Sequence, residues 1–255
     1  MSGNYMGRVV VVAGASGGIG QQIAKLLLER GARVGLHYRT APRELQELAE
    51  KYGSDRVLLI KGDLTRRDDA QRVVAETVAR FGKLDAFIST IGTALRIKPF
   101  LDTDDTTVDT TINIELRSVI HSIRAILPPM ISNGSGQIVL VGSDSGKVGT
   151  SGESVSAACR GAIIAFAKSI AREYARHNIL ANVVCPGPTE TGLWDDLVRN
   201  DEFGGKIGNA MVRATALRRL ARPEEVAATA VFLASTEASF ITGQAVSVSG
   251  GLTMC

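Results

Sequence analysis

Short apolar segments alternate along the chain with longer amphipathic ones, and this alternation constrains the fold more than any other feature. The first apolar segment, residues 9–13, is four valines and an alanine, a composition typical of strands buried on both faces of a parallel sheet. The next segment places Ile23, Leu26 and Leu27 on one helical face, and Gly31 follows it. Strands that alternate with helices predict parallel β-α-β units. We therefore predict an α/β fold with one doubly wound parallel sheet and helices on both faces.

The same alternation continues to the end of the chain and predicts seven strands. Residues 194–215 lack a clear period and are predicted to be irregular or weakly helical. No repeat or linker interrupts the 255 residues, so residues 1–255 are predicted to form a single domain. The strands are expected at 9–13, 33–38, 57–60, 84–89, 137–142, 179–184 and 246–249. The helices are expected at 21–29, 43–51, 68–81, 104–128, 152–177 and 223–234.

Composition and charge exclude several functional classes. The chain has 29 basic and 26 acidic residues, interspersed, so the net charge is only +3 and nucleic-acid binding is not expected. Three widely spaced cysteines and three scattered histidines give neither a disulfide framework nor a metal motif. The apolar runs are too short to span a membrane, and the first residues lack a signal pattern. We expect no metal, no membrane contact and a reducing, cytoplasmic setting.

A glycine-rich loop follows the first predicted strand and precedes the first predicted helix. It contains Gly14, Ser16, Gly18, Ile19 and Gly20. In a strand–loop–helix context such glycines permit a tight turn, a close approach of the backbone to a pyrophosphate, and close helix packing. The helix N-terminus offers free N–H groups to phosphates. The loop therefore predicts a Rossmann-type dinucleotide site.

The end of the second strand indicates which dinucleotide binds. An acid there would accept a hydrogen bond from the ribose 2′-hydroxyl of NAD, but no acid occurs before Glu44. Arg39 stands there instead and suits a 2′-phosphate, which favours NADP over NAD. The alternative is that Arg39 is simply a solvated loop residue.

The Gly-x-x-x-Gly-x-Gly spacing resembles the short-chain dehydrogenase/reductase family, and the likeness covers nearly the whole chain. The resemblance implies that the Asp63-Leu64 pair contacts the adenine and that Gly92 belongs to the loop beside the cofactor. It also implies that a Pro-Gly turn, followed by a threonine, holds the nicotinamide amide. The matching residues are Pro186, Gly187 and Thr191.

The catalytic residues of the family are matched only in part. Asn113 resembles the catalytic asparagine and Ser143 the catalytic serine. The family carries Tyr-x-x-x-Lys thirteen residues after that serine, and this chain has Ser156 and Arg160 at those positions. In addition, residues 89–92 read Ser-Thr-Ile-Gly instead of Asn-Asn-Ala-Gly, which puts the bulkier Ile91 beside the expected cofactor.

The two replacements alter the proton chemistry. In the family, lysine lowers the phenol pKa and the phenol acts as acid or base. Serine is a weaker and shorter acid, whereas Arg160 still suits a ribose diol as a fixed cation. Glu153, one helical turn before Ser156, is a candidate proton relay. We favour the alternative that Thr150 and Glu153 form a capping box at the helix start.

Three functions remain open. The first is an NADP-linked oxidoreductase acting on a secondary alcohol or ketone, such as a 3-oxoacyl thioester on coenzyme A or an acyl carrier, with residues 192–215 as substrate lid. The second is an inactive subunit that supports an active homologue. The resemblance implies homo- or hetero-tetramers formed through the two long helices. A cofactor-binding sensor or a non-redox enzyme is the third.

Overall fold

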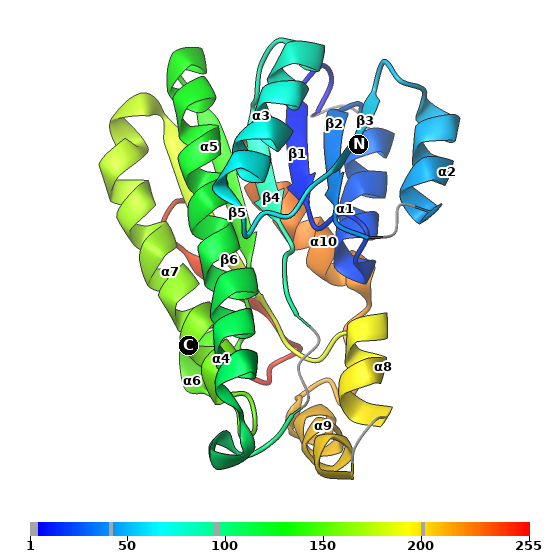
Figure 1. The fold of residues 1–255 in the computed structure, drawn as a ribbon, viewed down its shortest axis with the longest axis vertical. Coiled ribbons are helices and arrows are strands. Elements are labelled where there is room, and N and C mark those ends of the chain that lie inside the picture. The colour runs from blue at the N-terminus through cyan, green and yellow to red at the C-terminus, as the bar shows by residue number, and fades with distance from the viewer. Residues whose placement is uncertain (1–4, 41–42, 94–96, 200–201) are drawn as a thin grey trace.

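The computed structural model describes residues 5–40, 43–93, 97–199 and 202–255. Its centre is one seven-stranded sheet in the order β3-β2-β1-β4-β5-β6-β7, and all neighbouring strands pair in parallel (Figure 1). The predicted doubly wound, Rossmann-type α/β fold is confirmed. The strands are β1 (Val9–Ala13), β2 (Arg33–Tyr38), β3 (Val57–Lys61), β4 (Ala86–Ser89), β5 (Gly136–Val141), β6 (Ile179–Pro186) and β7 (Ala245–Val248).

Two helical layers cover the sheet, and each layer encloses its own apolar core. Both cores are built from fully buried aliphatic side chains of the strands and of the inward helix faces, and Figure 1 shows the layers on opposite sides. One layer contains α1 (Gly18–Glu29), α2 (Arg43–Tyr52) and α10 (Pro223–Leu233). The other contains α3 (Arg67–Phe81), α5 (Ser118–Asn133) and α7 (Ser154–Tyr174).

The helix ends follow the local signals of the sequence. Helix α3 stops at Gly82, which takes the left-handed conformation with φ of 83°. Asp104 caps α4 (Asp105–Thr111), because its carboxylate accepts a hydrogen bond from the Thr107 N–H at 2.8 Å. Pro223 begins α10, as predicted.

The predicted helix 104–128 is longer than expected and is not uniform. Helix α4 passes into a π-helical segment, Ile112–Arg117, and then into α5, which continues through Pro128 and Pro129 to Asn133. The wide π turn inserts an extra residue into the helix and thereby rotates the side chains that precede it relative to those that follow.

The prediction for residues 194–215 is wrong, because the structure has two helices there, α8 (Gly192–Arg199) and α9 (Glu202–Ala214). Several glycines lower the helix propensity of this segment and conceal its period. One of them, Gly208, is instead a contact point: a Cβ built there would lie 2.7 Å from Val198 Cγ2 and 3.3 Å from the Trp194 ring. The glycine lets the two helices approach closely.

Helix α7 combines unusual length with apolar character. Together with its last turn it spans Ser154–His177, the one described helix long and apolar enough to cross a membrane. Its buried residues Ile163, Ala167 and Ile170 belong to the core beneath the sheet. One face of α7 is therefore packed in the core, and 33% of its most apolar window is buried.

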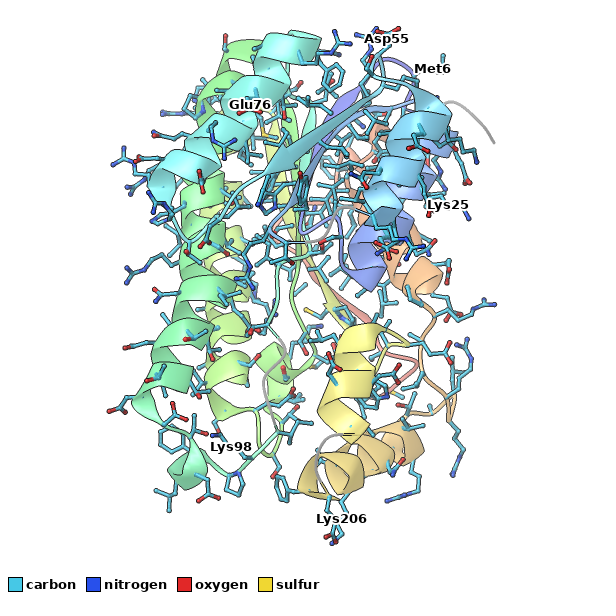
Figure 2. The ribbon with its side chains drawn as sticks, turned by 45° about the vertical axis from the view of Figure 1, so that its right-hand side comes forward. Met6, Lys25, Asp55, Glu76, Lys98 and Lys206 are labelled. Carbon is cyan, nitrogen blue, oxygen red and sulfur yellow. The ribbon has the colours of Figure 1, made fainter. Side chains whose placement is uncertain are left out.

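Charged side chains of both signs project from the two helical layers (Figure 2). Figure 2 shows Lys25 on α1, Glu76 on α3, and Asp55 between α2 and β3. Lys98 and Lys206 lie at the end of the molecule that carries α8 and α9.

Candidate active site

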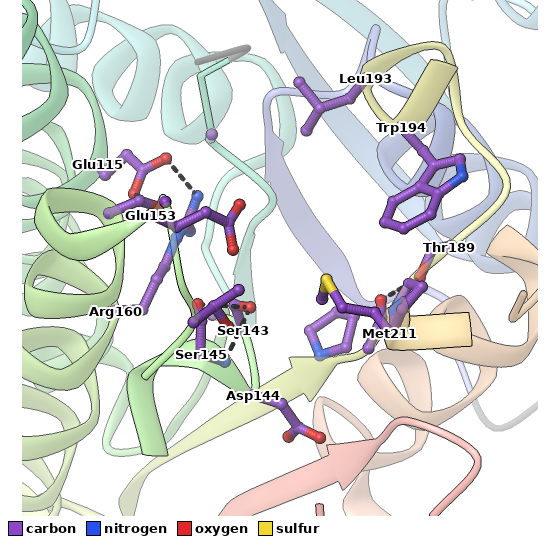
Figure 3. Close-up of a pocket in the computed structure, with 18 of the residues that line it drawn as sticks. Glu115, Ser143, Asp144, Ser145, Glu153, Arg160, Thr189, Leu193, Trp194 and Met211 are labelled. Carbon is purple, nitrogen blue, oxygen red and sulfur yellow. Dashed lines mark hydrogen bonds and ion pairs between the residues drawn. The ribbon is translucent and has the colours of Figure 1, made fainter. Parts of the chain in front are cut away.

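A cavity of about 520 Å³ lies at the carboxyl ends of the central strands. In a doubly wound sheet this edge, where the strand order reverses between β1 and β4, is the usual place for a ligand. The loops after β4, β5 and β6, together with Ile19 in the first turn of α1, form one side of the cavity, and α8 and α9 form the other (Figure 3). Among the predicted site residues, its wall includes Ile19, Gly92, Ser143, Ser156, Arg160, Pro186, Gly187 and Thr191.

The glycine loop forms a tight cradle in which positions 14 and 20 disfavour any side chain. Gly14 has φ of 77°, and a Cβ on Gly20 would lie 2.4 Å from the Gly14 carbonyl oxygen. Within the described residues, no hydrogen bond occupies the N–H groups of Gly18, Ile19 and Gly20 at the start of α1. These donors, at the positive end of a helix, fit the pyrophosphate of a dinucleotide.

His37 holds this cradle in place and was not singled out from the sequence. Its Nδ1 accepts a hydrogen bond from the Gly14 N–H at 3.1 Å, and its Nε2 lies 3.0 Å from the Gly62 carbonyl oxygen. Burial lowers the pKa of His37, so the ring is neutral at pH 7 with its proton on Nε2. The only signal in the sequence for this role is a polar residue near the end of a buried strand.

Arg39 and Asp63 stand at the ends of neighbouring strands β2 and β3, beyond the cradle. Arg39 is exposed and makes no ion pair with the described residues. The Asp63 carboxylate accepts hydrogen bonds from Thr65 N at 3.0 Å and Thr65 Oγ1 at 2.7 Å, so it shapes its own turn. Leu64 is buried in the core.

The other residues expected to contact the cofactor, Gly18, Gly187 and Thr191, lie in tightly packed surroundings. A Cβ on Gly18 would lie 3.0 Å from Thr191 Cγ2, so the start of α8 closes directly over the glycine loop. Thr191 Oγ1 also accepts a hydrogen bond from Trp194 N at 3.2 Å. A Cβ on Gly187, just after Pro186, would lie 2.9 Å from Ser249.

Ser143 follows β5 and faces the cavity. Its Oγ accepts hydrogen bonds from Ser145 N at 3.2 Å and from Ser145 Oγ at 2.9 Å. Both bonds use Ser143 as acceptor, which leaves its own hydroxyl proton free to bind a substrate oxygen.

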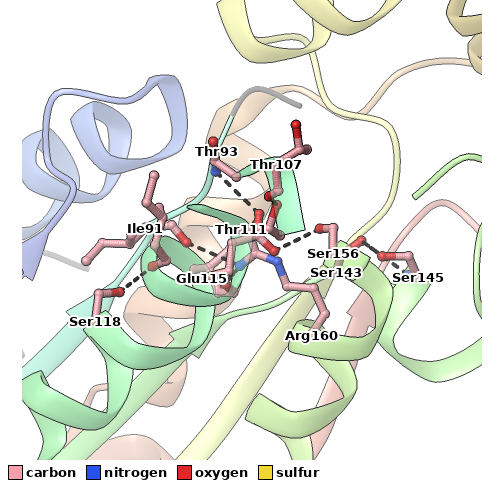
Figure 4. A network of polar contacts seen from close by, with 12 residues as sticks. Ile91, Thr93, Thr107, Thr111, Glu115, Ser118, Ser143, Ser145, Ser156 and Arg160 are labelled. Carbon is pink, nitrogen blue, oxygen red and sulfur yellow. Dashed lines mark hydrogen bonds and ion pairs between the residues drawn. The ribbon is translucent and has the colours of Figure 1, made fainter. Parts of the chain in front are cut away.

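Ser156 and Arg160 are engaged by a third residue, Glu115 (Figure 4). Ser156 Oγ donates to Glu115 Oε2 at 2.8 Å, and Arg160 Nη2 lies 2.9 Å from Glu115 Oε1. The side chains of Arg160 and Glu115 are only 9% and 2% exposed. Arg160 Nη1 donates to the carbonyls of Ile91 and Val141 at 3.2 and 3.1 Å. The guanidinium therefore joins β4, β5 and the π-helical segment, rather than lying open to a ribose.

The structure does not bring Asn113 into the cavity, contrary to its expected catalytic place. The π-helical turn turns Glu115 toward Ser156 and Arg160, and Asn113 does not line the cavity. The Ser118 hydroxyl donates to the Ile114 carbonyl in the widened turn. The signal that sequence reasoning missed is an acid, Glu115, set among apolar residues.

Glu153 does not form the predicted capping box. Helix α7 begins at Ser154, Glu153 makes no side-chain capping bond, and only its backbone N–H reaches the Thr150 carbonyl. Its carboxyl group points into the cavity between Arg160 and Ser143 (Figure 3). Burial, with a smaller effect from Glu115, raises the pKa of Glu153, and Arg160 only partly offsets this.

Comparison with known proteins places this geometry in a family. Residues 14–253 match a family model described as enoyl-(acyl carrier protein) reductase. The chain is 36% identical to nodulation protein G of Rhizobium sp. (strain N33) over 97% of this chain and 98% of that one. It is 32% identical to 3-oxoacyl-[acyl-carrier-protein] reductase of Chlamydia muridarum, over 99% and 100% of the two chains.

A solved structure is similar over the full length. It is described as a short-chain dehydrogenase/reductase, glucose/ribitol dehydrogenase, from Brucella melitensis. The TM-score is 0.88 and the identity 31%, with 100% of both chains covered. With the glycine cradle, the strand order and the cavity at the carboxyl edge, these likenesses show that the chain belongs to the short-chain dehydrogenase/reductase family of oxidoreductases.

Proposed function

We propose that the chain binds NADP(H) and interconverts a ketone and a secondary alcohol. The observation that carries this proposal is the continuity of the site: the glycine cradle, with its free N–H groups, opens into the cavity where Ser143 presents a hydroxyl. When bound, a nicotinamide dinucleotide supplies or accepts a hydride. The protein's part is to hold the phosphates with the start of α1, close α8 over them, and bind the substrate oxygen with Ser143.

The preference for NADP over NAD rests on Arg39. It is exposed at the end of β2, and no acid replaces it there. A guanidinium beside the adenosine ribose suits a 2′-phosphate and gives nothing comparable to a 2′-hydroxyl.

The substrate class follows from the two walls of the cavity. Apolar side chains of α8 and α9 form one wall, and the other includes hydroxyl-bearing side chains of α4 and of the loop between α6 (Ser145–Val148) and α7. A substrate with an apolar body and a polar carbonyl end fits both walls. A 3-oxoacyl thioester, on coenzyme A or an acyl carrier, has this form and agrees with the name of the Chlamydia relative. The three free cysteines suit a reducing, cytoplasmic setting.

Nucleotide titration tests cofactor binding directly. The purified chain is titrated with NADPH and with NADH, and binding is followed by nucleotide fluorescence. NADPH is expected to bind at least about tenfold more tightly, which corresponds to about 1.4 kcal/mol. Arg39→Gln should remove that preference. Arg33→Gln, an exposed arginine at the opposite end of β2, is the matched control and should keep it. No binding of either nucleotide would contradict the proposed function.

A second candidate function is that of a non-catalytic subunit beside an active homologue. The observation that favours it is the Glu115 network, which engages the two residues that stand in place of Tyr-x-x-x-Lys. The surfaces of α5 and α7 are the proposed contacts of a homo- or hetero-tetramer.

Co-purification distinguishes this candidate from the first. An inactive subunit should co-purify with a homologue that carries Tyr-x-x-x-Lys. Ser143→Ala in the present chain should then leave the activity of the complex unchanged. A large loss of activity on that substitution would exclude the non-catalytic role.

A further inference from the structure

The cavity lacks the usual acid–base pair, so the proton chemistry needs another group. Ser156 and Arg160 are both bonded to Glu115, and Arg160 is also bonded to two backbone carbonyls. Ser143 has a hydroxyl, which binds an oxygen well but ionises far above neutral pH. Asp144, at the far side of the cavity, accepts a hydrogen bond from Ser247 at 2.6 Å through one carboxylate oxygen, and its other oxygen is buried without a partner among the described residues, so this carboxylate is anchored away from Glu153 by Ser247.

Glu153 differs from all of these. Within the described residues its carboxyl group makes no hydrogen bond and no ion pair, although it lines the cavity. Figure 3 shows it projecting from the start of α7 into the open space on the side of Ser143. A partly buried carboxyl that makes no capping bond and has no polar partner is costly to keep unless it serves the ligand.

The charges around Glu153 come from three elements. Glu115, from the π-helical segment, disfavours a second negative charge beside it, and Arg160, two helical turns further along α7, attracts one. Lys98 lies at the same wall, where its N–H donates to the Gly152 carbonyl, but its ammonium is paired with Asp104 at 3.5 Å. Burial is the largest of these effects, and together with the Glu115 charge it outweighs the attraction of Arg160, so the pKa of Glu153 is raised and its protonated form is favoured relative to an exposed glutamate.

We propose that Glu153 is the catalytic acid and base of this chain, exchanging a proton with the substrate oxygen that Ser143 holds. The inference rests on the proposed function. In the direction of reduction, the carbonyl carbon gains the hydride and the C–O π pair moves to oxygen. That oxygen takes the Glu153 proton, which leaves an alcohol and a Glu153 carboxylate, and water then restores the proton. Glu115 is a positioning residue, because it acts on Glu153 through its charge.

The first test compares three variants by steady-state kinetics across pH. Loss of a positioned general acid lowers the rate by about 10²- to 10⁴-fold, and we expect that range for kcat of Glu153→Gln. Its pH profile should lose the ionisation that wild type shows, while the Kd for NADPH stays within about twofold. Glu153→Asp, one methylene shorter, should recover part of the rate and the ionisation. Glu173→Gln, an exposed acid at the far end of α7, is the matched control and should behave as wild type.

The second test needs no turnover. Infrared difference spectra of wild type minus Glu153→Gln should contain the carbonyl band of a protonated carboxylic acid, and titration should convert it to carboxylate at a higher pH than in an exposed glutamate. Ionisation of Glu153 at or below the pH at which an exposed glutamate ionises would overturn the proposal. So would Glu153→Gln with wild-type kcat and pH profile.

The outcomes separate this inference from the proposed function. If wild type fails to bind nucleotide, the proposed function itself fails. If wild type turns over substrate and Glu153→Gln is unaffected, only the role of Glu153 fails. If wild type binds NADPH but reduces none of a panel of 3-oxoacyl thioesters and cyclic ketones, the catalytic role of Glu153 is wrong and the non-catalytic subunit is favoured.

Discussion

A neutral histidine joins the three strand ends that support the glycine cradle. His37 accepts from Gly14 after β1, lies at the end of β2 and contacts the Gly62 carbonyl after β3. Its backbone carbonyl also accepts from Ala15 N at 2.9 Å. Protonation of Nδ1 would turn the acceptor for Gly14 into a donor, so the charged ring cannot keep this arrangement.

Replacing His37 should remove a component of acid sensitivity. Burial lowers the folded-state pKa below the ordinary 6.5, so the unfolded chain binds the proton first as pH falls. The contribution of His37 to the free energy of unfolding is fully present above about pH 6.5. As pH falls below that value, the contribution decreases by up to about 1.4 kcal/mol per pH unit until the folded-state pKa is reached. Urea unfolding of wild type and His37→Gln at pH 7.5 and 5.5 measures the difference. Equal losses on acidification would contradict the role of His37.

The sequence predicted some site residues and missed others, for a physical reason. Gly14 and Gly20 carry a local spacing, and Ser156 and Arg160 were found because they replace residues of a fixed motif. Glu115 was missed because its role depends on partners more than 40 residues away and on a π turn that no simple periodicity shows. Glu153 was assigned to a cap because the sequence does not show at which residue a helix begins.

At the scale of elements, the sheet was predictable, whereas the helices α8 and α9, which form the proposed substrate lid, were not. The central strands, such as β1 and β5, are apolar runs that are buried almost throughout on both faces, so composition identifies them. Helices α8 and α9 owe their stability to each other and to the cavity wall, where Trp194 packs by Gly208. Helix propensity does not include such tertiary contacts, and the glycines of this segment lower it further.

A methyl group at the crossing of α8 and α9 should loosen the lid. In Gly208→Ala the new Cβ would lie 2.7 Å from Val198 Cγ2, so the helices must separate slightly, at a cost of about 1–3 kcal/mol. Limited proteolysis should cut within residues 192–214 faster than in wild type. Gly192→Ala is the matched control, since a Cβ there meets nothing within 4 Å. Equal cleavage rates for Gly208→Ala and the control would show that the crossing does not hold the lid.

At the scale of the whole molecule, the beginning of the described chain is tied to its last helix. The Tyr5 hydroxyl donates to the Val231 carbonyl of α10 at 2.6 Å, and Arg8 Nη1 donates to the Ala234 carbonyl at 2.9 Å. Tyr5 is completely buried. Contacts between residues 226 positions apart close the chain around the sheet, and we predict that it unfolds as one cooperative unit.

Removal of the Tyr5 hydroxyl tests that tie. Tyr5→Phe leaves the Val231 carbonyl without this donor and should lower the free energy of unfolding by about 1–3 kcal/mol. Far-UV circular dichroism and the fluorescence of Trp194, the single tryptophan, should still report one common midpoint. Tyr52→Phe is the control, because its hydroxyl makes no hydrogen bond within the described residues. Separate midpoints for the two probes would contradict a single cooperative unit.

The buried Glu115–Arg160 pair also restricts how this chain can evolve. Removing either partner leaves an uncompensated buried charge, which costs about 3–5 kcal/mol, a large part of the stability of an ordinary domain. A lysine at position 160 would keep the charge opposite Glu115, but a single ammonium cannot reproduce the separate bonds of the guanidinium to Glu115 and to the Ile91 and Val141 carbonyls. Substitutions at positions 115 and 160 are therefore interdependent, and a neutral residue at either position is tolerated only when the other charge is removed as well.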